Sequence, residues 1–117
     1  MAFLMKMLGL GEQKYGSIDA DEYKANFLKQ KNHTMIDVRT TGEFAQGHIP
    51  GAKNIPLDQL RSRLTQIDKN KPVIVVCQSG NRSRSGSDIL VEAGWSDVRN
   101  FKGGTMAWRM RGFELKR

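Results

Sequence analysis

The chain has 117 residues, of which 38% are hydrophobic and 26% are charged. This length and composition are typical of one globular domain with a core of its own. The single cysteine excludes an internal disulfide framework and a zinc site built from several cysteines, and it favours a reducing, cytoplasmic compartment. We expect no cofactor and no bound metal.

Basic residues outnumber acidic residues by 19 to 12, which gives a formal net charge of +7. Nucleic acid, an anionic substrate, an acidic partner or solubility would each account for this excess. From Arg99 onward, six basic residues accompany the single acidic residue Glu114. No compact run of basic residues interleaved with aromatic residues accompanies this excess, so nucleic acid is a less favoured explanation.

Residues 1–14 form an N-terminal extension ahead of the domain, which we place at residues 15–117. Eight of the first ten residues are apolar, whereas a membrane-spanning helix needs about 20. No basic stretch precedes them and no A-x-A site follows, so a cleaved signal peptide is not expected. We expect a terminal turn packed on the domain or on a neighbour, with a membrane-surface anchor as the less favoured alternative.

The first half of the domain alternates between helix and strand patterns. Asp19 and Glu22 form a capping pair at the start of a helix with an apolar face. A short strand (34–38), a brief helix (40–46) and a turn rich in Gly and Pro (47–52) follow. Another strand is expected at Ile55, and one helical face is expected to carry Leu57, Leu60, Leu64 and Ile67.

The second half of the domain begins with "VIVV" (73–76), an apolar run typical of a strand that is covered on both faces. We expect a helix from Ser83 to about Ala93, ended by Gly94. A strand in "DVRNF" (97–101) and a helix in "GGTMAWRM" (103–110) complete the pattern. Strands and helices that alternate with short connections predict an α/β domain with a largely parallel sheet.

Cys77 stands where the apolar run ends and small polar residues begin. Ligands of open α/β sheets bind beyond the carboxyl ends of strands, and small residues let backbone N–H groups approach an anion. Gly80 permits a bend, and the helix start at Ser83 adds unpaired N–H groups. With Arg82 and Arg84 nearby, we expect the pKa of the thiol to be lowered and the thiolate to act as a nucleophile.

A lone cysteine is more often a small buried apolar residue. Here three motifs favour a nucleophile instead. The stretches "IDVRTTGEFAQGHIPGAKNIP" (36–56), "CQSGNRS" (77–83) and "FKGGTMAW" (101–108) resemble, in this order along the chain, the signatures of the rhodanese (thiosulfate sulfurtransferase) family. The resemblance covers about residues 17–113 and points to the small single-domain members. It implies a single rhodanese-like domain of the α/β class, with a largely parallel five-stranded sheet and helices on both faces.

The resemblance also implies a chemistry and a set of site residues. Cys77 would take the outer sulfur of a small anionic donor such as thiosulfate, carry it as a persulfide, and pass it to an external thiol, a sulfur-acceptor protein or, in assays, cyanide. Asp37 and Arg39 would belong to the supporting shell around the loop. Arg82 would lie at the loop's closing end, and the persulfide would be held by the loop residues Gln78, Ser79, Gly80, Asn81, Arg82 and Ser83.

Loop length separates sulfur transfer from phosphate-ester hydrolysis. Rhodanese-related phosphatases carry five residues between the cysteine and the arginine, whereas this chain carries four, Gln78 to Asn81. The shorter loop suits one sulfur atom rather than a tetrahedral phosphoryl group. Many relatives also carry a basic residue directly after the cysteine, so the neutral Gln78 makes a persulfide an alternative to thiosulfate as the natural donor.

The other candidate residues have structural interpretations. His33 is expected in a solvated turn, and His48 in a turn where a structural hydrogen bond is favoured over catalysis. Trp95 and Trp108 are expected to pack in the core. Two function classes stay open: an enzyme that turns over a sulfur donor in solution, and a persulfide carrier or docking module that acts only with partner proteins.

Overall fold

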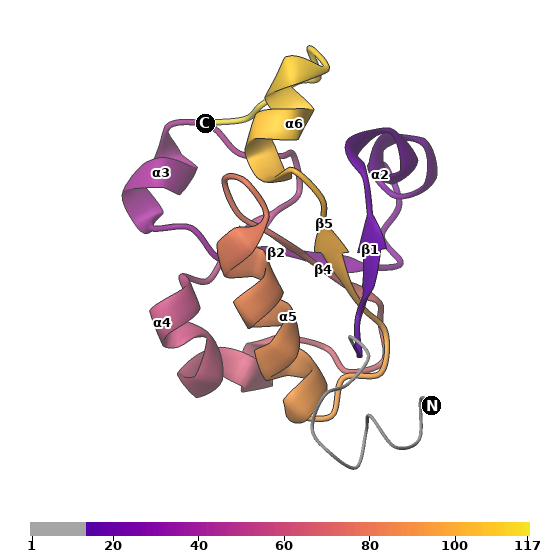
Figure 1. Ribbon diagram of the computed structural model, residues 1–117, viewed down its shortest axis with the longest axis vertical. Helices are drawn as coiled ribbons and strands as arrows, with labels where there is room; N and C mark the ends of the chain where they lie inside the picture. Colours follow the sequence, from indigo (N-terminus) through magenta and orange to yellow (C-terminus); the bar gives the residue numbers. More distant parts are fainter. Residues whose placement is uncertain (1–13) are drawn as a thin grey trace, which may run out of the picture.

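The computed structural model describes residues 14–117, so all but the last residue of the expected N-terminal extension lies outside the described part of the chain. Within that part, five parallel strands form one sheet in the order β1-β5-β4-β2-β3 (Figure 1). The strands are β1 (Gly16–Ile18), β2 (Thr34–Asp37), β3 (Lys53–Asn54), β4 (Val73–Val76) and β5 (Val98–Phe101). The predicted parallel five-stranded sheet is confirmed.

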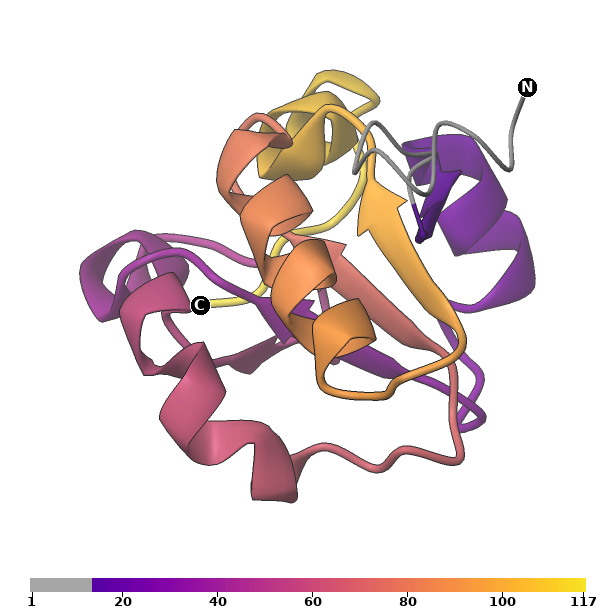
Figure 2. The same cartoon turned by 60° about the horizontal axis from the view of Figure 1, so that its bottom comes forward.

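Helices cover both faces of this sheet (Figures 1 and 2). They are α2 (Ala20–Asn26), α3 (Thr41–Ala45), α4 (Leu57–Leu60), the 3-10 helix η1 (Arg61–Gln66), α5 (Asn81–Glu92) and α6 (Gly104–Met110). Side chains alternate along each strand, so Ile36 and Val75 pack with α4 and α5, whereas Met35 and Ile74 pack with α2 and α6. The four residues of β4 are fully buried, as predicted for a central strand.

Helix α5 begins at Asn81, two residues before the predicted start at Ser83. Gly80 precedes it with φ +107°, a left-handed conformation that glycine adopts without a steric penalty. This conformation turns the chain directly from the loop into the helix. The predicted end is confirmed: Gly94 (φ +105°) lets Trp95 N donate to Leu90 O at 3.0 Å, which closes the last turn.

The apolar repeat from Leu57 to Ile67 does not form one continuous helix. The chain forms α4 and then the tighter η1, with a non-helical backbone at Arg63 (φ −118°). The Ser62 hydroxyl donates to Gln59 O at 2.9 Å, a local hydrogen bond of the kind that competes with the regular helical pattern. Leu60, at the end of α4, and Ile67, directly after η1, still reach the core.

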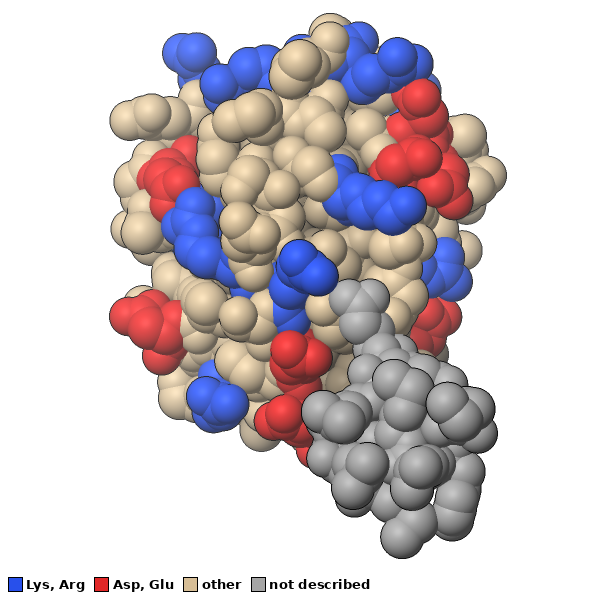
Figure 3. Space-filling model, in the orientation of Figure 1, with Lys and Arg blue, Asp and Glu red and all other residues tan. Residues whose placement is uncertain are grey.

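The carboxyl ends of the parallel strands meet at one edge, where α3, α5 and α6 begin (Figure 1). Lys and Arg side chains gather at this α6 end of the face seen in Figure 3. Of the helices between residues 14 and 117, none combines the length and the apolarity that crossing a membrane requires. The fold thus places the expected site at a basic end of the domain.

Candidate active site at the end of strand β4

The Cys77 thiol is buried within a ring of hydrogen-bond donors. Its side chain is 1% exposed and follows β4 directly. Gly80 N donates to Sγ at 3.1 Å, and Ser83 Oγ lies 3.4 Å from Sγ. The backbone amides of Ser79 and Ser83 add further hydrogen bonds. Loop and first helical turn therefore converge on a single sulfur atom.

These surroundings favour the thiolate. Burial alone raises the pKa of the Cys77 thiol, because it removes water from the charged form. The Ser83 hydroxyl and the amides of Ser83, Gly80 and Ser79 act in the opposite direction and outweigh burial, so the pKa lies below its ordinary value. A buried thiolate that accepts several hydrogen bonds is a ready nucleophile and needs no separate general base.

The start of α6 holds the backbone of the cysteine loop from the other side. Thr105 N and Thr105 Oγ1 both donate to Cys77 O, at 2.8 and 3.2 Å, and Met106 N donates to Gln78 O at 3.0 Å. Gly104 (φ +62°) makes this approach feasible, because a Cβ there would overlap the carbonyl oxygens of Cys77 and Gln78. No role was predicted for the pair Gly103-Gly104, although its place at the head of the "GGTMAW" helix was the available signal.

Arg82 forms an ion pair rather than facing the thiol alone. Its guanidinium donates to Glu43 at 2.7 and 2.8 Å, and Glu43 also closes a capping box with Thr40 at the start of α3. The Arg82 hydrogen bond is the main reason that the pKa of Glu43 is lowered to about 2. Glu43 raises the pKa of Arg82 most, while Cys77 contributes less. The loop amides and Ser83, more than Arg82, thus stabilise the thiolate.

Asp37 and Arg39 form a buried ion pair at the end of β2, beside β4. Arg39 Nη2 lies 2.8 Å from Asp37 Oδ2 and also donates to Gly47 O at 2.8 Å. Asn54 Nδ2 donates to Asp37 O and Arg39 O at 3.0 and 2.9 Å. The pair thus fixes the segment after β2 and the turn at Gly47. Its predicted support of the cysteine loop stays a prediction. Asn54 was not anticipated from sequence.

The remaining predicted loop residues lie around this centre rather than against the sulfur. Gln78 is half-buried, and Asn81 and Arg84 are exposed. Asn81 and Arg84 line a hollow of about 310 Å³ together with Lys102 and parts of β1 and β5. The catalytic and binding roles assigned to the predicted residues stay predictions.

The two histidines make hydrogen bonds within the fold, and the two tryptophans pack in its core. His33 lies in a bend beside the exposed Lys31 and Asn32, as expected, but it is half-buried and its Nε2 lies 2.7 Å from the Tyr23 hydroxyl. His48 Nδ1 donates to Phe44 O at 3.0 Å, as expected for a structural histidine. Trp95 and Trp108 are buried in the core. Between residues 14 and 117, no three His, Cys, Asp or Glu side chains cluster as metal ligands.

Comparison with known proteins decides the family. The pattern of the Rhodanese-like domain family matches residues 19–111. The chain belongs to the rhodanese-like family. A protein named "Sulfurtransferase" from Allochromatium vinosum is 32% identical over 98 residues, which cover 84% of this chain and 92% of that protein. The thiosulfate sulfurtransferase GlpE of Pseudomonas fluorescens is 35% identical, over 73% of this chain and 78% of its own length.

Solved rhodanese-like structures share the fold. The rhodanese-like domain protein of Staphylococcus aureus is 39% identical and superposes with a TM-score of 0.74, covering 87% of this chain and 99% of that one. A rhodanese-related protein of Thermoplasma volcanium is 31% identical with a TM-score of 0.78, covering 87% and 98%. The predicted family and fold are confirmed, and the sulfurtransferase relatives support a role of this rhodanese-like chain in sulfur transfer in general.

Proposed function

We propose that the protein is a sulfurtransferase that carries a sulfane sulfur on Cys77 as a persulfide. The observation that carries the proposal is the ring of donors around one buried sulfur atom, with Gly80 N at 3.1 Å and Ser83 Oγ at 3.4 Å from Sγ. Such a ring stabilises negative charge both on the thiolate and on a sulfur atom added to it. A small anionic donor fits the basic end of the domain.

The loading step transfers one sulfur atom. The Cys77 thiolate attacks the outer sulfur of thiosulfate, the S–S bond of the donor breaks, and sulfite leaves with the bonding electron pair. The product is the Cys77 persulfide anion, and the total charge is unchanged. The amides of Ser79, Gly80 and Ser83, which already hydrogen bond the thiolate, are the nearest donors for this anion. A persulfide donor reacts in the same way, with a thiolate as leaving group.

The discharge step regenerates the thiolate. An external thiolate attacks the outer sulfur of the protonated persulfide, the S–S bond at Cys77 breaks, and the cysteine thiolate leaves. In assays cyanide takes the sulfur as thiocyanate. Since Cys77 is the single cysteine of the chain, the acceptor thiol comes from another molecule.

Intact mass spectrometry tests the proposal. Incubation with thiosulfate or, separately, with a persulfide donor is expected to add one sulfur atom, which cyanide or dithiothreitol removes. Cys77→Ser is expected to stay folded by circular dichroism and to gain no sulfur. Cyanide-removable sulfur on Cys77→Ser would refute the proposal, and so would a wild type that gains no sulfur from either donor or from a persulfide-loaded partner protein. Loading that requires a partner protein would identify a carrier rather than a free enzyme.

A further inference from the structure

A hollow of about 310 Å³ adjoins the cysteine loop (residues 77–82) on the side of β1 and β5. Ser79, Gly80 and Asn81 form its wall toward the loop, and Cys77 is not among its lining residues. Gly80 N donates to Cys77 Sγ at 3.1 Å, so Gly80 contacts both the hollow and the sulfur atom. The hollow therefore lies outside the ring of donors around the sulfur, yet shares residues with that ring.

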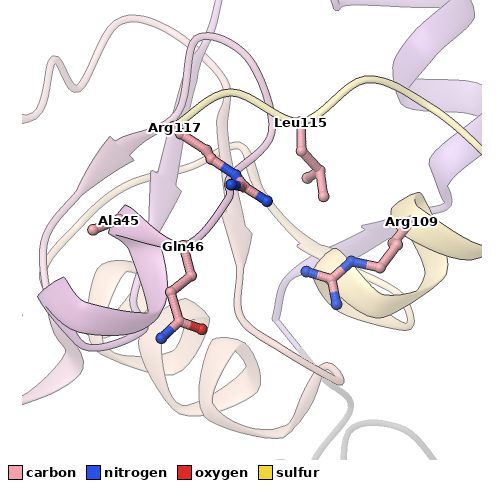
Figure 4. Close-up of a pocket in the computed structure, with 5 residues that line it drawn as sticks. All are labelled: Ala45, Gln46, Arg109, Leu115 and Arg117. Atoms are coloured by element: carbon pink, nitrogen blue, oxygen red, sulfur yellow. The ribbon is translucent and has the colours of Figure 1, made fainter.

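A larger hollow, of about 690 Å³, lies elsewhere at the same end of the domain (Figure 4). None of its lining residues belongs to the cysteine loop, and its polar side chains are exposed: Gln46, Arg109 and Arg117. Exposed polar groups are satisfied by water and do not require a ligand. The smaller hollow differs because one of its polar side chains is buried.

That side chain belongs to Asn100. It is 8% exposed, and its Oδ1 is buried without a hydrogen-bond partner among residues 14–117. Asn100 lies between Ser17 and Val75 in the sheet, on the face where Val75 and Val98 pack against α5. Asparagine is uncommon in strands, and an apolar side chain here would leave no polar atom unpaired. A buried amide at the hollow thus indicates a ligand with a hydrogen-bonding group that pairs with it.

Two basic side chains, Arg84 and Lys102, line the same hollow. Both are exposed, and no carboxylate of the described residues lies within ion-pair distance of either. A phosphate monoester carries a charge of about −1.5 to −2 at pH 7 and three acceptor oxygens. One such group can pair with both cations, whereas one carboxylate has the charge for one of them. The charges therefore favour a phosphate.

We propose that this hollow binds a phosphorylated ribose, either as a free sugar phosphate or as part of a nucleotide. The phosphate pairs with Arg84 and Lys102, and a ribose hydroxyl donates to Asn100 Oδ1. Tyr15 also lines the hollow and offers an aromatic ring on which the base of a nucleotide can pack. The volume is at the lower end of the range for small-molecule sites, which suits a ligand of this size. The site is additional to the proposed sulfur transfer and does not depend on it.

A ligand in the hollow also affects the cysteine. Its phosphate lies on the outer side of the loop whose Ser79 and Gly80 amides stabilise the Cys77 thiolate. A second negative charge close to a thiolate disfavours the charged form of the thiol. We therefore expect saturating ligand to slow the alkylation of Cys77 by iodoacetamide at neutral pH about threefold.

Calorimetric titrations of the full chain test the site with ribose 5-phosphate as the probe. Ribose 5-phosphate is expected to bind about tenfold more tightly than inorganic phosphate, and ribose to show no binding. Arg84→Gln and Lys102→Gln are each expected to weaken the binding of ribose 5-phosphate about tenfold. Arg61→Gln and Lys29→Gln, at exposed positions outside the hollow, supply the same charge changes as controls. Tighter binding of AMP would identify a nucleotide, and equal or weaker binding a sugar phosphate.

Asn100→Leu tests the buried amide separately from the charges. Leucine has nearly the shape of asparagine and no polar atom, so the urea midpoint is not expected to fall. The affinity for ribose 5-phosphate is expected to drop about tenfold, to that of inorganic phosphate, whose own affinity stays unchanged. A drop that is equal for both ligands, or no drop, would overturn the assignment of Asn100.

Three results would overturn the site: no binding of ribose 5-phosphate or AMP, equal affinity for ribose 5-phosphate and inorganic phosphate, or an equal loss in the control variants. Cys77→Ser is expected to bind ribose 5-phosphate like the wild type, and a loss there would place the ligand in the ring around the sulfur instead. An alkylation rate that saturating ligand leaves unchanged would overturn the effect on Cys77. These measurements involve no sulfur transfer, so failure of sulfur loading would refute the proposed function alone.

Discussion

The Arg82 guanidinium makes two parallel hydrogen bonds to the Glu43 carboxylate, from Nη1 to Oε1 at 2.7 Å and from Nη2 to Oε2 at 2.8 Å. They join the first turn of α5 to the first turn of α3 across 39 residues of sequence. The two side chains are 38% and 34% exposed, so water weakens their attraction. The pair therefore matters more for the position of the loop than for total stability.

Glu43→Gln is expected to lower stability at neutral pH by about 0.5 to 1 kcal/mol, the scale of an exposed ion pair. The pKa of Glu43 is about 2, below its unfolded value, mainly because of the Arg82 hydrogen bond. The contribution is therefore complete above pH ~4.5 and is lost as the pH falls toward 2. Urea unfolding of wild type and variant at pH 6, 4 and 2.5 measures this difference.

The matched control is Glu22→Gln. Glu22 closes a capping box with Asp19 at α2, and in the described structure no ion pair to a basic side chain accompanies that box. Glutamine retains the capping hydrogen bond in both variants. Only the Glu43 variant is expected to show a pH-dependent loss. A loss that persists unchanged at pH 2.5 would contradict the assignment to the ion pair.

Ser83→Ala is expected to raise the pKa of Cys77. Burial already acts to raise it, and the Ser83 hydroxyl is the first of the groups that lower it. Because only the thiolate attacks iodoacetamide, alkylation at neutral pH should slow about tenfold, the scale of one hydrogen bond to a charged group. The difference should disappear at a pH above both thiol pKa values. Ser85→Ala, exposed on the same helix, is the control, and identical pH–rate profiles for the two variants would refute the role of Ser83.

Gly104→Ala tests the contact between α6 and the cysteine loop. The new Cβ would overlap the carbonyl oxygens of Cys77 and Gln78, in addition to the strain of φ +62°. Gly112→Ala has the same kind of strain at φ +76°, but nothing lies within 4 Å of its Cβ. We expect about 1 kcal/mol of destabilisation for Gly112→Ala and about 1 to 3 kcal/mol more for Gly104→Ala. Equal urea midpoints for Gly104→Ala and Gly112→Ala would show that the overlap with the loop carbonyls does not lower stability.

The sheet and the cysteine position were predictable because their signals are local. "VIVV" has no polar position, so it predicts a strand buried on both faces, and the polar residues after Cys77 mark its carboxyl end. The helix start was missed by two residues because Gly80 adopts a left-handed conformation that composition alone does not reveal.

The contacts that complete the site could not be predicted because they join distant segments. The capping box with Thr40 is a local reason for a glutamate at position 43. Nothing in the sequence therefore pointed to the ion pair between Glu43 and Arg82. The need for glycine at position 104 arises because α6 packs against the cysteine loop, 26 residues earlier in the sequence. There the carbonyl groups of Cys77 and Gln78 occupy the space that a Cβ of residue 104 would fill.

Gln78→Arg tests whether the missing charge after the cysteine governs the choice of donor. The backbone of Gln78 is held by Met106 N, and its side chain is half-buried, so the substitution changes mainly the side-chain charge. Thiosulfate is a dianion, and an added guanidinium at the loop should lower its KM about fivefold, the scale of one partly exposed charge contact. Gln78→Glu should raise the KM by a similar factor. Both effects should shrink in about 0.5 M salt, where charges are screened within a few ångströms. Steady-state assays with thiosulfate and cyanide measure the three proteins side by side, and equal KM values would show that position 78 does not select the donor.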